Sequence, residues 1–288
     1  MTTPSPRRLA GRRTVVALIG AVCLTGPLAA CGSSDNTSSA GGSSYESKLV
    51  SPGTLTFCSD ISAPPLTYYD TKQKPVGTEI ELGDAIAKKM KLKATWNNVA
   101  FAGIIPAIQA HQCDAIMSQL YIKPEREKVL DFVPYMYAGN TVLVAKGNPA
   151  GISSIGALCG KKVATQTGTT AAEVLAEQTK KCQSAGDSPI QVAQFNRDSE
   201  AQQQLKIKLV DAYATTVEVA GYAMKNQPDA FETVGKPFGK VKTGIATLKD
   251  ASALHNGLTK AFEAVRADGT YDKILKEWQL TSDALPTT

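Results

Sequence analysis

The chain has 288 residues, 43% hydrophobic and 20% charged, so it is long enough to bury a sizeable core and suits a soluble globular protein. Its formal net charge of +5 would favour an acidic partner, but four of the 31 basic residues lie before Cys31, where no acid occurs. The rest of the chain has 27 basic and 26 acidic residues. Its charge is therefore nearly balanced and gives no argument for a nucleic-acid partner.

The N-terminal segment has the pattern of a signal peptide. Four arginines between Arg7 and Arg13 precede the apolar run TVVALIGAVCLTGPLAA at residues 14–30. This run is too short and wrongly flanked for an ordinary membrane span. We therefore predict that residues 1–30 form a signal peptide.

A lipid anchor is expected directly after it. The sequence LAACGSS resembles a bacterial lipobox, in which the cysteine, here Cys31, is lipidated and becomes the new N-terminus. Residues 32–47 are rich in Gly and Ser and have little to bury, so we expect residues 31–50 to form a flexible tether. These features predict a protein held by lipid outside the cytoplasmic membrane, at the surface of a bacterium.

Strand-like and helix-like patterns alternate through the rest of the chain. Apolar residues have helical spacing at residues 81–90 and 254–265. Alternation of this kind predicts an α/β fold with mostly parallel sheets flanked by helices. The strand-like runs lie at residues 55–58, 114–117, 141–145, 162–165, 190–195, 210–214 and 244–248.

Few motifs of known chemistry occur. The two histidines, His111 and His255, are far apart and lack neighbouring cysteines or carboxylates, and no nucleotide-binding or nucleophile-elbow motif is found. We expect no metal and no cofactor. The sequence QTGTT, residues 166–170, lies between a predicted strand and a predicted helix. A simple helix cap and an anion site at the helix N-terminus explain it equally well.

The sequence KPEREKVLDFVPY, residues 123–135, resembles a motif of the solute-binding proteins that serve polar amino-acid ABC transporters. The resemblance covers residues 51–280, nearly the whole mature chain, and we identify the chain as similar to that family, in a lipoprotein form. Other stretches resemble further family motifs in the expected order: GTEIEL at 77–82, FAGIIPAIQAHQCDAIM at 101–117, GALCGKKVATQTGTTAAEVL at 156–175 and LTKAFEAVRADGTYDKILKEW at 258–278.

The resemblance implies a Venus-flytrap architecture, the type II periplasmic-binding-protein fold, in which two α/β lobes close around one small ligand. Lobe 1 is expected to comprise residues 51–142 and 244–288, and lobe 2 residues 143–243. The chain would cross between the lobes twice, and the crossing segments would act as hinges. The implied function is capture of a carboxylate-bearing nitrogenous solute, an amino acid or a derivative, for an ABC permease, by a monomer.

The resemblance also implies a role for Arg126, which would bind the ligand's α-carboxylate with paired guanidinium donors. The alternative is a solvated arginine at a helix end. Other matching positions are Asp60, which would line the cleft; Phe101, a wall against the ligand side chain; Ser118, Gln119 and Tyr121, around the carboxylate; and Gly168, Thr169 and Thr170, from lobe 2.

One position departs from the family pattern. The family commonly has an aspartate where Thr216 aligns, and that aspartate receives the ligand's α-ammonium. A threonine cannot balance a buried ammonium. Either Glu218 or Asp60 takes over, or the ligand lacks a free α-ammonium. Because Tyr121 also stands where Ser or Thr is usual, we expect an unusual amino acid, such as an N-substituted or cyclic derivative, with a plain α-amino acid as the second option.

Four cysteines follow Cys31. The spacing of Cys159 and Cys182 around a predicted strand and helix allows them to meet, so we predict a disulfide between them. We expect Cys58 and Cys113 to be buried thiols, because opposite ends of neighbouring parallel strands lie too far apart for a bridge.

Two other functions are compatible with this fold. Some dehydratases of cyclohexadienyl carboxylates share it, and Asp60 or Glu218 would then act as a general acid. We expect no enzyme, because no nucleophile and base pair is evident. A receptor that presents its ligand to a membrane sensor would use the same closed form as a transporter component.

Overall fold

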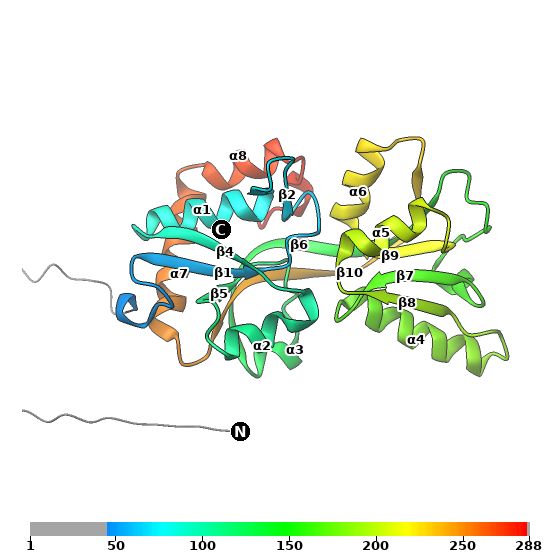
Figure 1. Cartoon of the computed structure of the whole chain (residues 1–288), viewed down its shortest axis with the longest axis horizontal. Helices are drawn as coiled ribbons and strands as arrows, with labels where there is room; N and C mark the ends of the chain where they lie inside the picture. The colour runs from blue at the N-terminus through cyan, green and yellow to red at the C-terminus, as the bar shows by residue number, and fades with distance from the viewer. Residues whose placement is uncertain (1–44, 287–288) are drawn as a thin grey trace, which may run out of the picture. The chain divides into compact units, whose positions relative to one another are not determined.

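The computed structural model describes residues 45–286. The predicted signal peptide and the predicted lipidation at Cys31 lie outside these residues. Within the described part the chain alternates strands and helices from Thr54 onward, as expected for an α/β fold (Figure 1).

Lobe 1 contains three parallel strands with helices on both sides (Figure 1). β1 is the middle strand of the three and is buried along most of its length. β2 and β3 form a separate two-stranded antiparallel sheet. The elements are β1 (Thr54–Ser59), β2 (Tyr68–Tyr69), β3 (Pro75–Val76), α1 (Thr78–Lys89), β4 (Lys93–Asn98), α2 (Ile104–Gln109), β5 (Ala115–Ile116), α3 (Pro124–Glu127), α7 (Ser252–Ala267) and α8 (Thr270–Glu277).

Lobe 2 repeats this arrangement with a second parallel set, in which β7 lies between β8 and β9. In Figure 1, α4 covers one face of these strands, and α5 and α6 lie on the other side. The elements are β7 (Lys162–Gln166), α4 (Thr170–Ser184), β8 (Gln191–Phe195), α5 (Asp198–Lys206), β9 (Ala212–Thr216) and α6 (Val217–Asn226).

Two long strands join the lobes. β6 (Leu130–Ala145) and β10 (Phe231–Leu248) pair antiparallel from one end to the other, with interruptions, and unite both halves in one eight-stranded sheet, in the order β4-β1-β5-β10-β6-β9-β7-β8. Register shifts interrupt the pairing between Val234 and Val241 and again after Thr243. The expected lobe boundaries at residues 142 and 243 stay a prediction, because both strands are continuous there.

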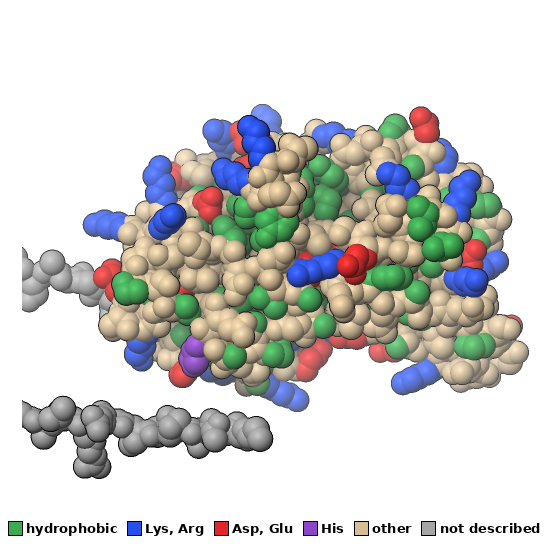
Figure 2. Space-filling view, in the orientation of Figure 1, with side chains coloured by type: hydrophobic (Ala, Val, Ile, Leu, Met, Phe, Trp, Pro, Cys, Tyr) green, Lys and Arg blue, Asp and Glu red, His purple; other side chains and the backbone are tan. Residues whose placement is uncertain are grey.

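Each lobe has its own apolar core. One cluster joins Phe57 and Leu82 to α7 and α8, and a second joins Ile108 and Ile116 under α2. In lobe 2 the clusters form around Val163 and around Tyr213. On the face shown in Figure 2, basic and acidic side chains are interspersed, in line with the near balance of charge beyond Cys31.

Part of the expected tether is folded. Residues 45–50 include the short helix Glu46–Lys48, and Tyr45 and Leu49 are buried in the lobe 1 core. The Tyr45 ring lies so close to Gly257 that a Cβ on that glycine would come within 2.7 Å of it. The prediction that residues 45–50 are flexible is therefore wrong, because two large apolar side chains here find a place in the core.

The structure contains two disulfides among its described residues. The predicted bridge between Cys159 and Cys182 is confirmed. The prediction of free thiols at Cys58 and Cys113 is wrong, because these residues also form a bridge, with their Cα atoms 5.5 Å apart. β5 begins only at Ala115, so Cys113 lies before the strand, in the chain that follows α2, and packs beside Cys58. The long separation expected for two cysteines at opposite ends of neighbouring strands therefore does not apply, because Cys113 is not in a strand.

We expect removal of the Cys58 and Cys113 bridge by a double Ala substitution to lower the free energy of unfolding by about 2–4 kcal/mol, because the bridge closes a loop between residues 55 positions apart. Urea unfolding of oxidised wild type and variant measures the change. Non-reducing peptide mapping is the control, and free thiols at both positions in the native protein would contradict the pairing.

Candidate ligand-binding cleft

A cavity lies between the lobes, where the carboxyl ends of the parallel strands from both halves meet. Ligands commonly bind at this edge of an α/β sheet. The cavity has an apolar part that includes Ala63 and Leu66. Nine of the ten residues predicted to bind ligand line it: Asp60, Phe101, Ser118, Gln119, Tyr121, Arg126, Thr169, Thr170 and Thr216.

Gly168 is the predicted residue that does not line the cavity. Its backbone is left-handed, with φ of +79°, and a Cβ there would lie 3.1 Å from the Cα of Ala102 in lobe 1. Glycine at this position therefore permits a close approach between the two lobes.

Arg126 is a buried cation in this cavity. It lies in α3, which begins with Pro124, and is only 9% exposed. One guanidinium nitrogen, Nη1, donates to the carbonyl oxygen of Tyr121 at 3.0 Å, and the guanidinium lies 5.7 Å from the centre of the Phe101 ring. Burial lowers the pKa of Arg126, an effect that the nearby carboxylate of Glu173 opposes. Among the described residues no carboxylate forms an ion pair with it. A buried cation with free donors is suited to bind an anion.

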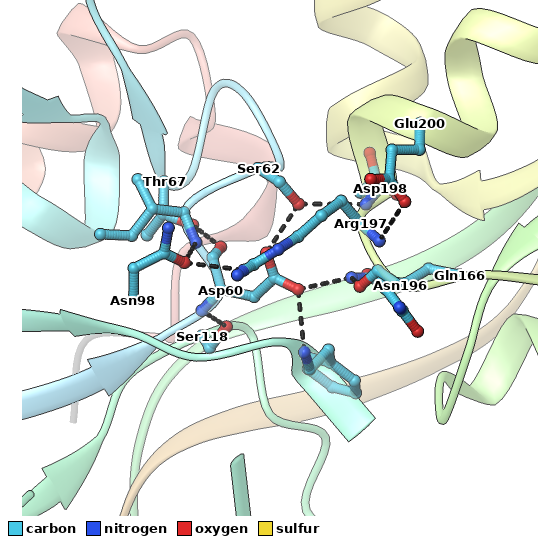
Figure 3. Close-up of polar contacts among 12 residues, drawn as sticks. Asp60, Ser62, Thr67, Asn98, Ser118, Gln166, Asn196, Arg197, Asp198 and Glu200 are labelled. Carbon is cyan, nitrogen blue, oxygen red and sulfur yellow. Dashed lines mark hydrogen bonds and ion pairs between the residues drawn. The ribbon is translucent and has the colours of Figure 1, made fainter. Parts of the chain in front are cut away.

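Asp60 is the centre of a polar network that bridges the lobes (Figure 3). It ends the first segment of lobe 1 after β1 and is 3% exposed. Its Oδ1 accepts from Ser62 Oγ at 2.6 Å and from Arg197 Nη1 at 3.0 Å. Its Oδ2 accepts from the Phe101 backbone N–H at 2.9 Å and from Gln166 Nε2 at 2.5 Å. Both oxygens are thus fully engaged, and two of the four donors come from lobe 2.

Sequence reasoning missed Arg197. It is the N-cap residue of α5, and its Nη1 also donates to Asn98 Oδ1 at 2.7 Å, so one side chain of lobe 2 contacts two strand ends of lobe 1 (Figure 3). Further bridges are the ion pair between Lys123 and Glu173 and the hydrogen bond from Gln119 Nε2 to Glu218 Oε2 at 2.9 Å. The structure is therefore the closed arrangement of the two lobes.

The QTGTT turn contains the expected helix cap, whereas the anion site stays a prediction. Thr169 caps α4, because its Oγ1 accepts from the backbone N–H of Ala172 at 3.2 Å. The Thr170 hydroxyl is buried, lines the cavity and has no hydrogen-bond partner within residues 45–286. Capping thus accounts for one threonine, and the hydroxyl of the second is without a partner among the described residues.

The segment around Ser118 is held from within lobe 1. Ser118 Oγ accepts from the backbone N–H of Asp60 at 3.0 Å, and the Tyr121 hydroxyl donates to Asn140 Oδ1 at 3.4 Å. The backbone N–H of Gln119, at a φ of +45°, donates to Glu79 Oε1 at 2.7 Å. These bonds fix the loop that contains Tyr121, whose carbonyl oxygen accepts a hydrogen bond from Arg126.

Two buried acids in the cavity were also missed. Glu79 is 1% exposed, and Asp198, at the start of α5, is 5% exposed. Burial raises the pKa of each to about 7, and the charge of nearby Asp60 adds to the effect at Asp198. The tyrosine hydroxyls of Tyr135 and Tyr213 bond to Glu79 and Asp198, respectively. The sequence did contain a signal for Asp198, because this acid follows closely after the strand-like run at residues 190–195.

Thr216 caps α6, with its Oγ1 accepting from the backbone N–H of Val219 at 3.4 Å. Glu218 is one of the two acids suggested to replace the family's aspartate at this position. It does not line the cavity and lies instead on a separate groove beside α8.

Within residues 45–286 no group of three or more metal-ligating side chains is found. No helix in the same range is long and apolar enough to cross a membrane.

Two lobes on one sheet, two connecting strands and a polar cavity between them define a two-lobed ligand-binding protein. Residues 55–281 match the family of bacterial extracellular solute-binding proteins, family 3, and the chain belongs to that family. It is 29% identical to the ABC transporter arginine-binding protein 1 of Escherichia coli K12, over 78% of this chain and 90% of that protein.

Solved structures agree with this assignment. An ancestral arginine-binding protein bound to arginine is 38% identical, with a TM-score of 0.71 over 78% of this chain and 98% of that one. The ancestral amino acid-binding protein AncCDT-1, a precursor of cyclohexadienyl dehydratase, is 33% identical, with a TM-score of 0.71 over 78% and 95% of the two chains. The type II periplasmic-binding-protein fold expected from the sequence is confirmed.

We expect Arg197→Ala to favour the open arrangement. The ion pair with Asp60 is partly exposed, with 28% of the Arg197 side chain accessible, so its loss should cost about 1 kcal/mol of closure. Small-angle X-ray scattering should show a larger radius of gyration for the variant. Lys180→Ala, which removes an exposed cation of the same lobe, is the control. Equal radii for wild type and Arg197→Ala would contradict a bridging role.

We expect stability to fall as the pH rises from about 4.5 to 8. The folded chain keeps a proton on Glu79 up to about pH 7, whereas the unfolded chain loses it near 4.5. This carboxyl therefore stabilises the fold below pH 4.5, and its contribution, on the order of 3 kcal/mol, is lost as the pH passes 7. Urea unfolding across this range should show a weaker pH dependence for Glu79→Gln.

Exposed Glu81 in the same helix provides the control, since Glu81→Gln should keep the wild-type pH dependence. A slope in Glu79→Gln equal to that of wild type would mean that Glu79 is ionised in the folded protein throughout this range.

Proposed function

We propose that this chain is the ligand-capturing component of an ABC importer, and that it binds an amino acid or an amino-acid derivative by its carboxylate. The observation that carries the proposal is Arg126, a buried cation that lines the cavity, lies 5.7 Å from the centre of the Phe101 ring and has no ion-pair partner among the described residues. A planar guanidinium matches a carboxylate with two parallel hydrogen bonds.

Lobe 2 would complete the carboxylate site. The free hydroxyl of Thr170 lines the same cavity and belongs to the first turn of α4, where the helix dipole favours negative charge. A carboxylate held by Arg126 from one lobe and Thr170 from the other binds more tightly when the lobes are closed. The ligand would therefore shift the population toward the closed form that a permease can distinguish from the open one.

The named relatives support an amino-acid ligand. They include arginine-binding proteins and an L-cystine-binding protein of Escherichia coli, the latter 26% identical over 80% of this chain. We further propose that the protein acts as a monomer, that Cys31 carries a lipid, and that the lipid keeps the protein beside its permease at the cell surface.

The main proposal is a binding protein without catalytic activity. A dehydratase is the second candidate, because Glu79 and Asp198 are cavity acids whose pKa of about 7 suits general acid catalysis. Incubation of the protein with a cyclohexadienyl carboxylate, followed by mass spectrometry, distinguishes the two. Turnover that depends on either acid would replace the proposed binding function, whereas an unchanged carboxylate supports the binding function.

A receptor that presents its ligand to a membrane sensor is a separate alternative. The gene of such a receptor would lack a permease gene beside it.

We expect a thermal-shift screen of the full chain against the twenty L-amino acids, their Nα-acetyl derivatives and simple carboxylates to yield a ligand. At about 100 times its dissociation constant a ligand stabilises the fold by roughly 2.7 kcal/mol. Arg126→Ala should weaken binding of every carboxylate hit by about 30-fold or more, because it leaves the ligand's charge buried and unpaired.

Lys128→Ala removes an exposed cation two residues from Arg126 and should leave the ligand's effect unchanged. Hits that Arg126→Ala does not affect, or the absence of any carboxylate among the hits, would contradict the proposed carboxylate site.

A further inference from the structure

We propose that Arg197 determines the specificity of the cleft: by binding Asp60, it excludes amino acids whose side chain carries a positive charge. This inference rests on the proposed function, because it concerns ligands whose carboxylate Arg126 would bind. It narrows their class to amino acids with an uncharged side chain.

The charged residues of the cavity wall decide whether a cationic side chain can be held there. They are one cation, Arg126, and three acids, Asp60, Glu79 and Asp198. A cation that enters a closed cleft loses its hydration and needs an ionised acid in return. The outcome therefore depends on which of the three acids can still accept one.

Asp60 has no acceptor left for a ligand. The hydroxyl of Ser62 and the guanidinium of Arg197 donate to its Oδ1, the latter at 3.0 Å. The backbone N–H of Phe101 and the side-chain amide of Gln166 donate to its Oδ2. Arg197 is the charged donor among these four, so it balances the negative charge of Asp60 within the protein.

Arg197 is held in this position from two further sides. Its backbone N–H donates to Glu200 Oε2 at 3.2 Å, and its Nη1 also donates to Asn98 Oδ1 at 2.7 Å (Figure 3). A ligand cation would have to displace a guanidinium that is already oriented and covalently attached to lobe 2. The ligand would lose translational freedom in doing so, whereas Arg197 has none of this freedom to lose.

Displacement of Arg197 would also weaken closure. Arg197 belongs to lobe 2, whereas Asp60 and Asn98 belong to lobe 1. A cationic ligand on Asp60 would leave the guanidinium of Arg197 without an anion. A ligand with an uncharged side chain leaves this contact between the lobes intact, so the closed form favours it.

The two other acids of the wall do not replace Asp60. Glu79 is 1% exposed and Asp198 is 5% exposed, and each accepts from a tyrosine hydroxyl. The second oxygen of each is buried. Burial raises the pKa of both to about 7, so at pH 6 both carry a proton and no charge. Neither then offers a counter-ion to a cationic side chain.

The apolar part of the wall suits an uncharged side chain. Ala63 and Leu66 of lobe 1 and Ala214 and Val219 of lobe 2 line the cavity, together with the ring of Phe101. Burial of an aliphatic side chain against such residues is favourable, whereas a charged group there would lose its water without compensation.

Isothermal titration of the full chain at pH 6 with amino acids of matched shape tests this specificity. L-citrulline has a neutral urea in place of the guanidinium of L-arginine, and L-norleucine has a methyl group in place of the side-chain ammonium of L-ornithine. We expect wild type to bind the uncharged member of each pair about 30-fold or more tightly than the cationic member.

Two variants separate the charge of Arg197 from its other contacts. Arg197→Gln keeps a hydrogen-bond donor for Asp60 but leaves its charge unbalanced, so the preference for the uncharged members should fall about tenfold or more. Arg197→Lys keeps the charge and should keep the preference. A shift toward the open form weakens both members of a pair alike, so it does not change their ratio. Circular dichroism checks that each variant is folded.

Lys206→Ala is the matched control, because it removes an exposed cation from the last turn of the same helix, α5, and should leave the ratios unchanged. Ratios that Arg197→Gln leaves at the wild-type value would overturn the role of Arg197. Equal weakness of both members of each pair in wild type would assign the exclusion to shape rather than charge and would also overturn it.

Two further outcomes separate this inference from the proposed function. Wild type that binds arginine or ornithine as tightly as the uncharged counterpart, or more tightly, would overturn the inference even if no variant folds, while leaving carboxylate capture intact. No binding of these four ligands or of any of the twenty L-amino acids would contradict the proposed function and the inference together.

Discussion

The antiparallel pairing of β6 with β10 is the constraint on which the rest of the structure depends. These strands run from Leu130 opposite Leu248 to Ala145 opposite Phe231, and they carry one sheet from lobe 1 into lobe 2. As a result, the parallel strands of both lobes end at the same central gap. Loops at such strand ends are free of the sheet's hydrogen-bond ladder, so their side chains can be used for a ligand.

The charged side chains in that gap differ in whether they have partners within the protein. Asp60 and Arg197 neutralise each other across the lobes, and Gln166 completes the shell of the carboxylate. Arg126, in contrast, lines the cavity without an ion-pair partner among residues 45–286. The pair of Asp60 and Arg197 holds the lobes together through contacts within the protein, whereas Arg126 would gain an anionic partner only from a ligand.

The two disulfides and the N-terminal segment stabilise the lobes rather than the cleft. Cys58 and Cys113 join β1 to the chain before β5, and in lobe 2 Cys159, which precedes β7, is joined to Cys182 in the last turn of α4. Each bridge lies within one lobe, so neither restricts closure. Tyr45 adds an apolar contact to the lobe 1 core before the first strand begins.

The sequence by itself determined the α/β class, the family, the Cys159 bridge and the placement of Arg126 at the cleft, because these depend on local periodicity and on short motifs. Only the tertiary structure decided that Asp60 is neutralised by Arg197, which lies 137 residues away, and that Cys58 reaches Cys113. It also brought Asp198 into the cavity. Contacts of this kind depend on how strands from distant parts of the chain are brought together, and no local pattern records the direction in which a side chain at a strand end will point.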